Sequence, residues 1–162
     1  MAILILSFGL LAIGGMMAYA VQLPKIAGNR ASAMAIGTDL VERMRANIPG
    51  FTSGQYTTAL TYNGGIAIPA NPSSAGCTYP NCSAASLATL DLNWAQFQAR
   101  AQLPGGGYRI ENLGNQQGNL WILWQEPNNF GSYATKSSDN CPNAAAAFTN
   151  PQPRCVFIPF RL

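Results

Sequence analysis

Histidine is absent from this 162-residue sequence, and charged residues make up only 9% of it. Without histidine, the ordinary Ser-His-Asp and Cys-His catalytic systems are excluded. The six carboxylates show no catalytic spacing either. Asp39 and Glu42 lie about one helical turn apart, and we expect them to form local ion pairs with Arg43 and Arg45. The sequence therefore predicts neither an enzyme nor a bound cofactor.

Basic residues are also few. Nine lysines and arginines against six acidic residues give a formal net charge of +3. The basic residues are scattered and form no stripe that could bind phosphates, so nucleic acid is not an expected partner. After Pro49 the polar residues are mostly neutral, which is typical of an extracellular surface.

The four cysteines lie in this polar part of the chain, at Cys77, Cys82, Cys141 and Cys155. An even number of cysteines after an apolar segment favours two disulfides formed in an oxidising compartment. A zinc site is the alternative, but the spacing is not C-x2-C, and without histidine only an all-cysteine site is possible. Three pairings are possible. The two local ones, Cys77 with Cys82 and Cys141 with Cys155, are the most economical.

Residues 1–21 carry no charge, and no basic residue precedes them. A secretory signal peptide normally begins with a basic residue. A run of about 20 apolar residues meets the length of a membrane-spanning helix. We therefore predict a membrane segment over residues 1–21.

The next segment predicts an amphipathic helix, because apolar residues recur at three- and four-residue steps. Pro49 and Gly50 are expected to end this helix, and Pro24 is expected to kink or locally melt the chain. If residues 1–48 are helical throughout, they form a rod about 70 Å long. The apolar positions are Ile26, Ala33, Ile36, Leu40, Met44 and Ile48.

The remaining residues, 49–162, predict a globular head with an α+β fold. A second helix is expected over residues 84–102, with Ser83 as its N-cap and the following "LPGGG" as its stop. Its large apolar residues share one helical face, which we expect to pack against the sheet as a buried seam. They are Leu87, Leu90, Trp94 and Phe97.

Strands are expected at "GYRIENL", "NLWILWQE" and "RCVFIPF", and a short one at "QYTTALTY". In the tryptophan-containing strand, Leu120, Ile122 and Trp124 are expected on one face, and Trp121 and Leu123 on the other. Pro159 belongs on an edge strand. The long loop over residues 127–153 requires a tie, which a Cys141–Cys155 bond would provide.

Three stretches together resemble a known family. The segment "AILILSFGLLAIGGMMA", followed by a helix ending "LVERMRANIPG", resembles the N-terminal region of type IV pilins. The stretches "CSAASLATLDLNWAQFQARAQLPGGG" and "LWILWQE" are similar to the PilV class of minor pilins. The basic leader, the Gly-Phe junction and the glutamate of pilin sequences are missing here, so the resemblance implies a truncated start.

The resemblance implies a structural minor pilin that primes or modifies type IV pilus assembly and could help present a tip adhesin. Its partners would be other minor and major pilins and a PilY-type adhesin. The subunit would wait in the bacterial inner membrane with its head in the periplasm, and then enter the extracellular pilus.

The same resemblance divides the chain into an N-terminal helix, residues 1–48, and a head, residues 49–162. The apolar helix would pack in a bundle of pilin helices, where small residues permit close approach. The residues expected in this bundle are Leu4, Phe8, Gly9, Leu11, Gly14, Gly15 and Ala18. Those expected to join the helix to the head are Ile36, Leu40, Met44, Leu87, Leu90, Trp94 and Phe97.

Two alternatives stay open. A pseudopilin of a type II secretion system shares the plan of a long helix and a head. A secreted binding module is also possible, with "AYA" at residues 18–20 as a signal-peptidase site. The long amphipathic helix would then be an awkward free N-terminus.

Overall fold

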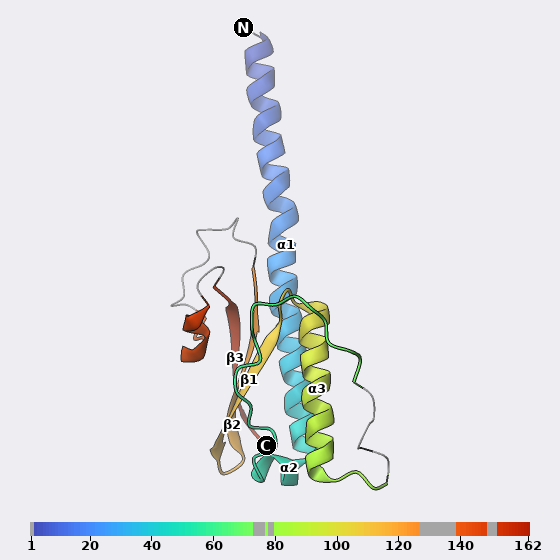
Figure 1. Ribbon diagram of the computed structural model, residues 1–162. Coiled ribbons are helices and arrows are strands. Elements are labelled where there is room, and N and C mark those ends of the chain that lie inside the picture. The colour runs from blue at the N-terminus through green and yellow to red at the C-terminus, as the bar shows by residue number, and fades with distance from the viewer. Residues whose placement is uncertain (1, 73–76, 78–79, 127–138, 149–151) are drawn as a thin grey trace.

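The computed structural model describes residues 2–72, 77, 80–126, 139–148 and 152–162, apart from the side chains of residues 2–6, 8, 18, 19 and 21–23. It has the predicted α+β fold: a long N-terminal helix extends from a head that contains further helices and a three-stranded antiparallel sheet (Figure 1). The elements are α1 (Ala2–Ala46), α2 (Ile48–Thr52), α3 (Ala84–Gln102), β1 (Gly107–Gly114), β2 (Gln117–Trp124), the 3-10 helix η3 (Asn143–Ala147) and β3 (Arg154–Arg161).

Helix α1 is continuous through Pro24, so the local melting expected there does not occur. The helix ends at Ala46, and the next residue, Asn47, is the N-cap of α2. The Asn47 side chain accepts a hydrogen bond from the Gly50 amide. Pro49 therefore lies in the first turn of a new helix and does not simply end the first one. A proline is tolerated in a first turn because its missing N–H would have no helical partner there.

Strand β2 lies at the centre of the sheet, in the order β1-β2-β3. Its side chains alternate as predicted, because Leu120, Ile122 and Trp124 belong to the main core while Trp121 and Leu123 belong to a second cluster. Pro159 lies on β3, which is an edge strand.

The predicted strand at residues 55–62 does not form, and this segment instead covers the free edge of β1. An isolated β-bridge pairs Thr58 with Ile110. The Thr58 amide donates to the Ile110 carbonyl (3.2 Å), and its hydroxyl accepts from the Ile110 amide (3.3 Å). Thr61 makes the same two bonds to Tyr108, at 2.9 and 2.8 Å. Threonine hydroxyls thus replace backbone carbonyls as partners of the edge amides.

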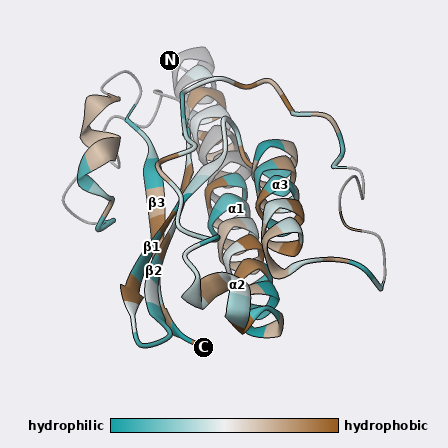
Figure 2. Ribbon diagram, turned by 60° about the horizontal axis from the view of Figure 1, so that its bottom comes forward, coloured by the Kyte–Doolittle hydropathy of each residue, from teal (hydrophilic) through white to brown (hydrophobic). Residues whose placement is uncertain are grey.

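The main core lies between the sheet and the helices. Helices α1 and α3 lie side by side on one face of the sheet, and hydrophobic residues are distributed along both (Figure 2). The opposite face of the sheet carries the smaller cluster, which lies beneath η3 and the disulfide-tied loop. It is formed by Tyr62, Trp121, Leu123, Ala145 and Cys155.

Candidate functional site: an exposed helical stem and its anchorage in the head

The N-terminal part of α1, residues 2–25, projects from the head (Figure 1) and is called the stem here. Every stem side chain that the structure describes is exposed. Five large apolar side chains are between 55% and 73% exposed: Leu10, Leu11, Ile13, Met16 and Met17. A large apolar surface of this kind is typical of an interaction site.

The small residues of the stem are equally open. A Cβ atom added at Gly9, Gly14 or Gly15 would meet nothing within 4 Å. Of the residues predicted to pack in a helix bundle, Leu11 is therefore largely exposed, and the three glycines have open space beside them. The side chains of Leu4, Phe8 and Ala18 lie outside the described set.

The membrane segment predicted over residues 1–21 is not supported. Among the helices that the structure describes, none is found with the length and apolarity needed to cross a membrane.

The C-terminal part of the same helix, residues 33–46, is called the embedded half here. It contributes Ile36, Leu40 and Met44 to the main core, where the sequence placed them. Helix α1 passes close to the sheet at Gly37, because an added Cβ there would collide with the Ile158 side chain. The embedded half is thus a structural part of the head.

Helix α3 buries a different face from the predicted one. Leu87, Leu90, Trp94 and Phe97 are only partly buried. Trp94 and Phe97 instead contact each other edge to face, with ring centroids 5.7 Å apart. The buried line along α3 is made of three alanines and one acid, and Arg100 is also buried. The line consists of Ala88, Asp91, Ala95 and Ala99. Small side chains allow two helices to approach closely, so the larger residues flank the contact.

The buried acid of α3 bonds α1 directly and is linked through Tyr56 to Asn47, the N-cap of α2. The Tyr56 hydroxyl donates to Asp91 Oδ2 (2.5 Å), and Arg43 Nη1 donates to Oδ1 (3.2 Å). Asn47 Nδ2 donates both to the Tyr56 hydroxyl (3.1 Å) and to the carbonyl of Ala84 (2.8 Å). Burial, together with the bond to the carboxylate, raises the pKa of Tyr56. Asp91 is paired and hydrogen-bonded, as a buried charge requires.

The exposed side of the embedded half carries the ion pairs that the sequence predicted. Arg43 Nε bonds Asp39 Oδ2 at 2.8 Å, and Arg45 Nη1 bonds Glu42 Oε1 at 2.5 Å. The bond to Asp39 is the main cause that raises the pKa of Arg43. These carboxylates act as local partners of arginines.

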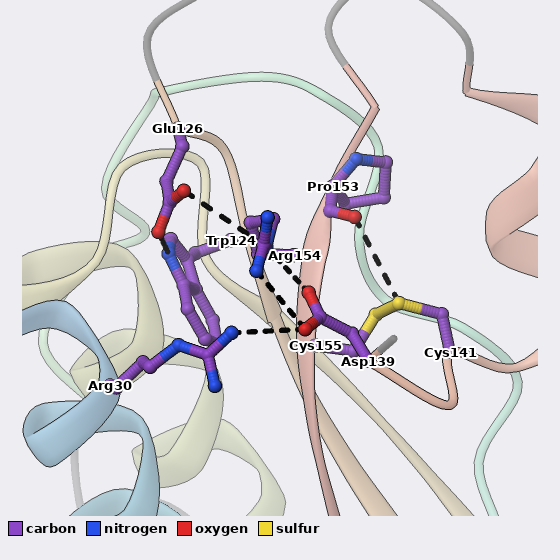
Figure 3. A network of polar contacts seen from close by, with 8 residues as sticks. All are labelled: Arg30, Trp124, Glu126, Asp139, Cys141, Pro153, Arg154 and Cys155. Carbon is purple, nitrogen blue, oxygen red and sulfur yellow. Dashed lines mark hydrogen bonds and ion pairs between the residues drawn. A yellow bond between two sulfur atoms is a disulfide. The ribbon is translucent and has the colours of Figure 1, made fainter. Parts of the chain in front are cut away.

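A second polar network begins just above the embedded half and ties α1 to the C-terminal loop (Figure 3). Arg30 Nη2 lies 2.9 Å from Asp139 Oδ1, and Arg154 Nε lies 2.5 Å from Asp139 Oδ2. Arg154 also approaches Glu126 at 4.0 Å, and that carboxylate accepts from Trp124 Nε1 at 3.2 Å. The Asp139 side chain is 6% exposed, so the loop carboxylate is enclosed by its partners.

Both local disulfides form in the structure, Cys77–Cys82 and Cys141–Cys155. The second bond joins the segment that contains Asp139 and Cys141 to β3, directly beside Arg154 (Figure 3). With all four cysteines bonded, the zinc alternative is wrong. No group of His, Cys, Asp and Glu suited to a metal ion occurs among the described residues.

Sequence reasoning missed the Asp91 and Asp139 networks. The available signal for Asp91 was its place in the alanine line of α3, where it is the one carboxylate of that helix. Nothing local marks Asp139, because its partners Arg30 and Arg154 are distant in sequence.

Comparison with known families yields one match. The family model Tt1218-like, described as type IV pilin Tt1218, matches residues 15–93, from the stem to the middle of α3. No curated protein and no solved structure matches the sequence. The match supports a type IV pilin, and the α+β head with its small antiparallel sheet is consistent with a type IV pilin-like fold.

Proposed function

We propose that this protein is a structural subunit of a type IV pilus, and that its stem packs against the helices of neighbouring pilins. The observation that carries the proposal is the exposed apolar stem, which continues without a break into a helix embedded in the head. The family match across both parts supports it.

The stem has the physical properties that such packing needs. Fully burying a large apolar side chain contributes roughly 1.5–3 kcal/mol relative to leaving it exposed. The open backbone at Gly9, Gly14 and Gly15 permits neighbouring helices to approach closely. The head, held by its core and its disulfides, is carried on the outside of the bundle.

Within pili, we assign the protein to the minor pilins of the PilV class, which prime or modify assembly. The resemblance of the motif that ends in "LPGGG" and of the tryptophan-containing strand to this class supports the assignment. In the structure these two motifs form α3 and β2. Its partners are then major and minor pilins, and a PilY-type protein at the tip.

A type II secretion pseudopilin is the second candidate, since the exposed stem fits both assemblies. Deleting the gene separates them. Loss of surface pili with normal protein secretion supports the pilus, whereas loss of secretion with normal piliation supports the pseudopilus.

A matched pair of substitutions tests the role of the stem. Leu11 of the stem is 73% exposed and Leu113 of the head is 57% exposed. In a strain lacking the chromosomal gene, Leu11→Glu should abolish incorporation into sheared, purified pili, because a carboxylate would enter an apolar bundle. Leu113→Glu should be incorporated normally. Equal incorporation of the two variants would overturn the proposal.

A further inference from the structure

The outer face of the sheet, away from α1, contains a cavity that the assembly role does not use. Its volume is about 320 Å³. Arg109 and Glu111 of β1, Trp121 of β2 and residues 140–143 of the disulfide-tied loop line it. Ligand pockets are roughly 300–1,000 Å³ in volume, so this one suits a small ligand such as a single sugar ring.

Strand register builds the floor of the cavity. Arg109 pairs with Trp121, and Trp121 pairs with Phe157 of β3. The Arg109 guanidinium lies over the Trp121 ring, 5.8 Å from its centroid, and the Phe157 ring lies 5.2 Å from the same indole. Trp121 Nε1 donates to the Asn140 carbonyl at 3.0 Å. Trp121 is only 9% exposed, so it is a fixed floor that orients Arg109.

Among the described residues, Arg109 is held on the sheet face without an acidic partner. Arg30, Arg43, Arg45 and Arg154 each pair with a carboxylate. Arg100 donates to Asn63 Oδ1 instead, and Arg161 is exposed at the end of β3. Within the described part of the chain, Arg109 has no carboxylate at ion-pair distance, and only its contact with Trp121 is recorded. A partly buried guanidinium that is held in place without an anion is suited to bind one, since it offers a rigid fork of donors.

The rest of the lining selects among anions. Glu111 lies two residues along β1 on the same face as Arg109, and its carboxylate accepts from Asn119 Nδ2 at 3.3 Å. A carboxylate in the same cavity repels a bare anion but accepts hydrogen bonds from the hydroxyl groups of a ligand. Asn140 and Asn143 also line the cavity, at its loop side.

We propose that this cavity binds a sugar acid, a hexuronic acid residue with one carboxylate and several hydroxyls. The carboxylate pairs with Arg109, and the hydroxyls donate to Glu111 and bond the asparagine amides. A neutral sugar leaves the guanidinium unpaired, and a small anion leaves Glu111 and the asparagines without ligand partners. The inference concerns the head alone and does not depend on the assembly role of the stem.

The test is a titration of the 162-residue chain in mild detergent, followed by the Trp121 indole N–H signal in 15N NMR. Galacturonate, galactose and acetate are the probes, because galactose lacks only the carboxylate and acetate lacks the hydroxyls. We expect galacturonate to shift the Trp121 signal saturably, with binding at least tenfold tighter than either other probe. Equal binding of galactose or of acetate overturns the proposal.

Variants assign the charge contact. Arg109→Gln should weaken galacturonate binding at least tenfold, whereas Arg161→Gln, an exposed arginine on β3, should leave it unchanged. Unaltered indole signals of Trp94 and Trp124 would show that the head of each variant is folded. Binding that survives Arg109→Gln contradicts the proposal. Trigalacturonate can be titrated in the same way. If it binds more tightly than the monomer, the ligand is the terminal residue of a polysaccharide and not a free sugar acid.

Discussion

The stem and the embedded half belong to one unbroken helix, yet their surroundings are opposite. From Ala2 to Pro24 the stem has no charge, and its described side chains are exposed. The embedded half is amphipathic: Leu40 and Met44 are fully buried, while Asp39 on the other side forms an ion pair. The apolar pattern alone therefore does not decide burial within a chain. The apolar surface of the stem is not covered by the described residues of the chain, which favours a role in contacts with other molecules.

The largest effect should separate the two halves directly. Leu40→Ala removes a side chain with no exposure and should lower the free energy of unfolding of the head by about 2–5 kcal/mol. Leu11→Ala removes an exposed side chain and should change it by less than about 0.5 kcal/mol. Urea unfolding followed by tryptophan fluorescence measures both, since Trp121 and Trp124 are buried in the head. Similar losses of unfolding free energy in the two variants would contradict the distinction between the stem and the embedded half.

The disulfide-tied loop is expected to affect only the head. In the loop-entropy model, removing Cys141–Cys155 by a double Cys→Ser substitution should cost about 3 kcal/mol, and removing the shorter Cys77–Cys82 ring about 2 kcal/mol. The difference follows from the sequence separations of 14 and 5 residues. The same unfolding assay measures both variants, and circular dichroism should show that helix content is retained. A larger loss from the shorter ring would contradict this expectation.

The Asp91 network should give the embedded half a pH dependence that the stem lacks. Tyr56→Phe removes a hydrogen bond to a carboxylate and should cost about 2 kcal/mol at neutral pH. Because burial raises the pKa of Tyr56 in the folded state, its contribution is complete below pH 10, the ordinary tyrosine value, and falls as the pH rises further.

Unfolding measured between pH 8 and 11 checks this sign. The wild-type chain should lose stability above pH 10, and Tyr56→Phe should lose it less steeply. Some slope should persist, because burial also raises the pKa of Tyr108. An unchanged slope in the variant would show that Tyr56 does not titrate as described.

The smallest effect is expected where the stem meets the head. Arg30 is 46% exposed, so Arg30→Gln should cost less than about 1 kcal/mol, as is usual for a partly exposed ion pair. Hydrogen exchange should nevertheless be faster at residues 26–32 in this variant. Lys25→Gln, in the stem, is the control and should change neither quantity. Equal hydrogen exchange in the two variants would show that Arg30 does not help to hold α1 to the head.

Local sequence signals predicted much of this fold. The pattern of residues 84–102 with a Ser83 cap identified α3, and alternation in β2 identified both faces of the sheet. The predictions that were wrong concern features that depend on contacts between distant segments. Thr58 and Thr61 look like strand residues, but their hydroxyls satisfy the edge of β1. The size of Trp94 suggested burial, whereas the close contact between α1 and α3 uses alanines.

Photo-crosslinking in assembled pili tests the central claim most directly. A photoreactive amino acid is placed at Met16 in the stem or at Met34 near the start of the embedded half, which are 73% and 46% exposed. In purified pili, the position of Met16 should crosslink to another pilin with a clearly higher yield than that of Met34, because neighbouring helices enclose the stem. A yield at Met16 equal to or below that at Met34, with both variants present in the filament, would contradict the account.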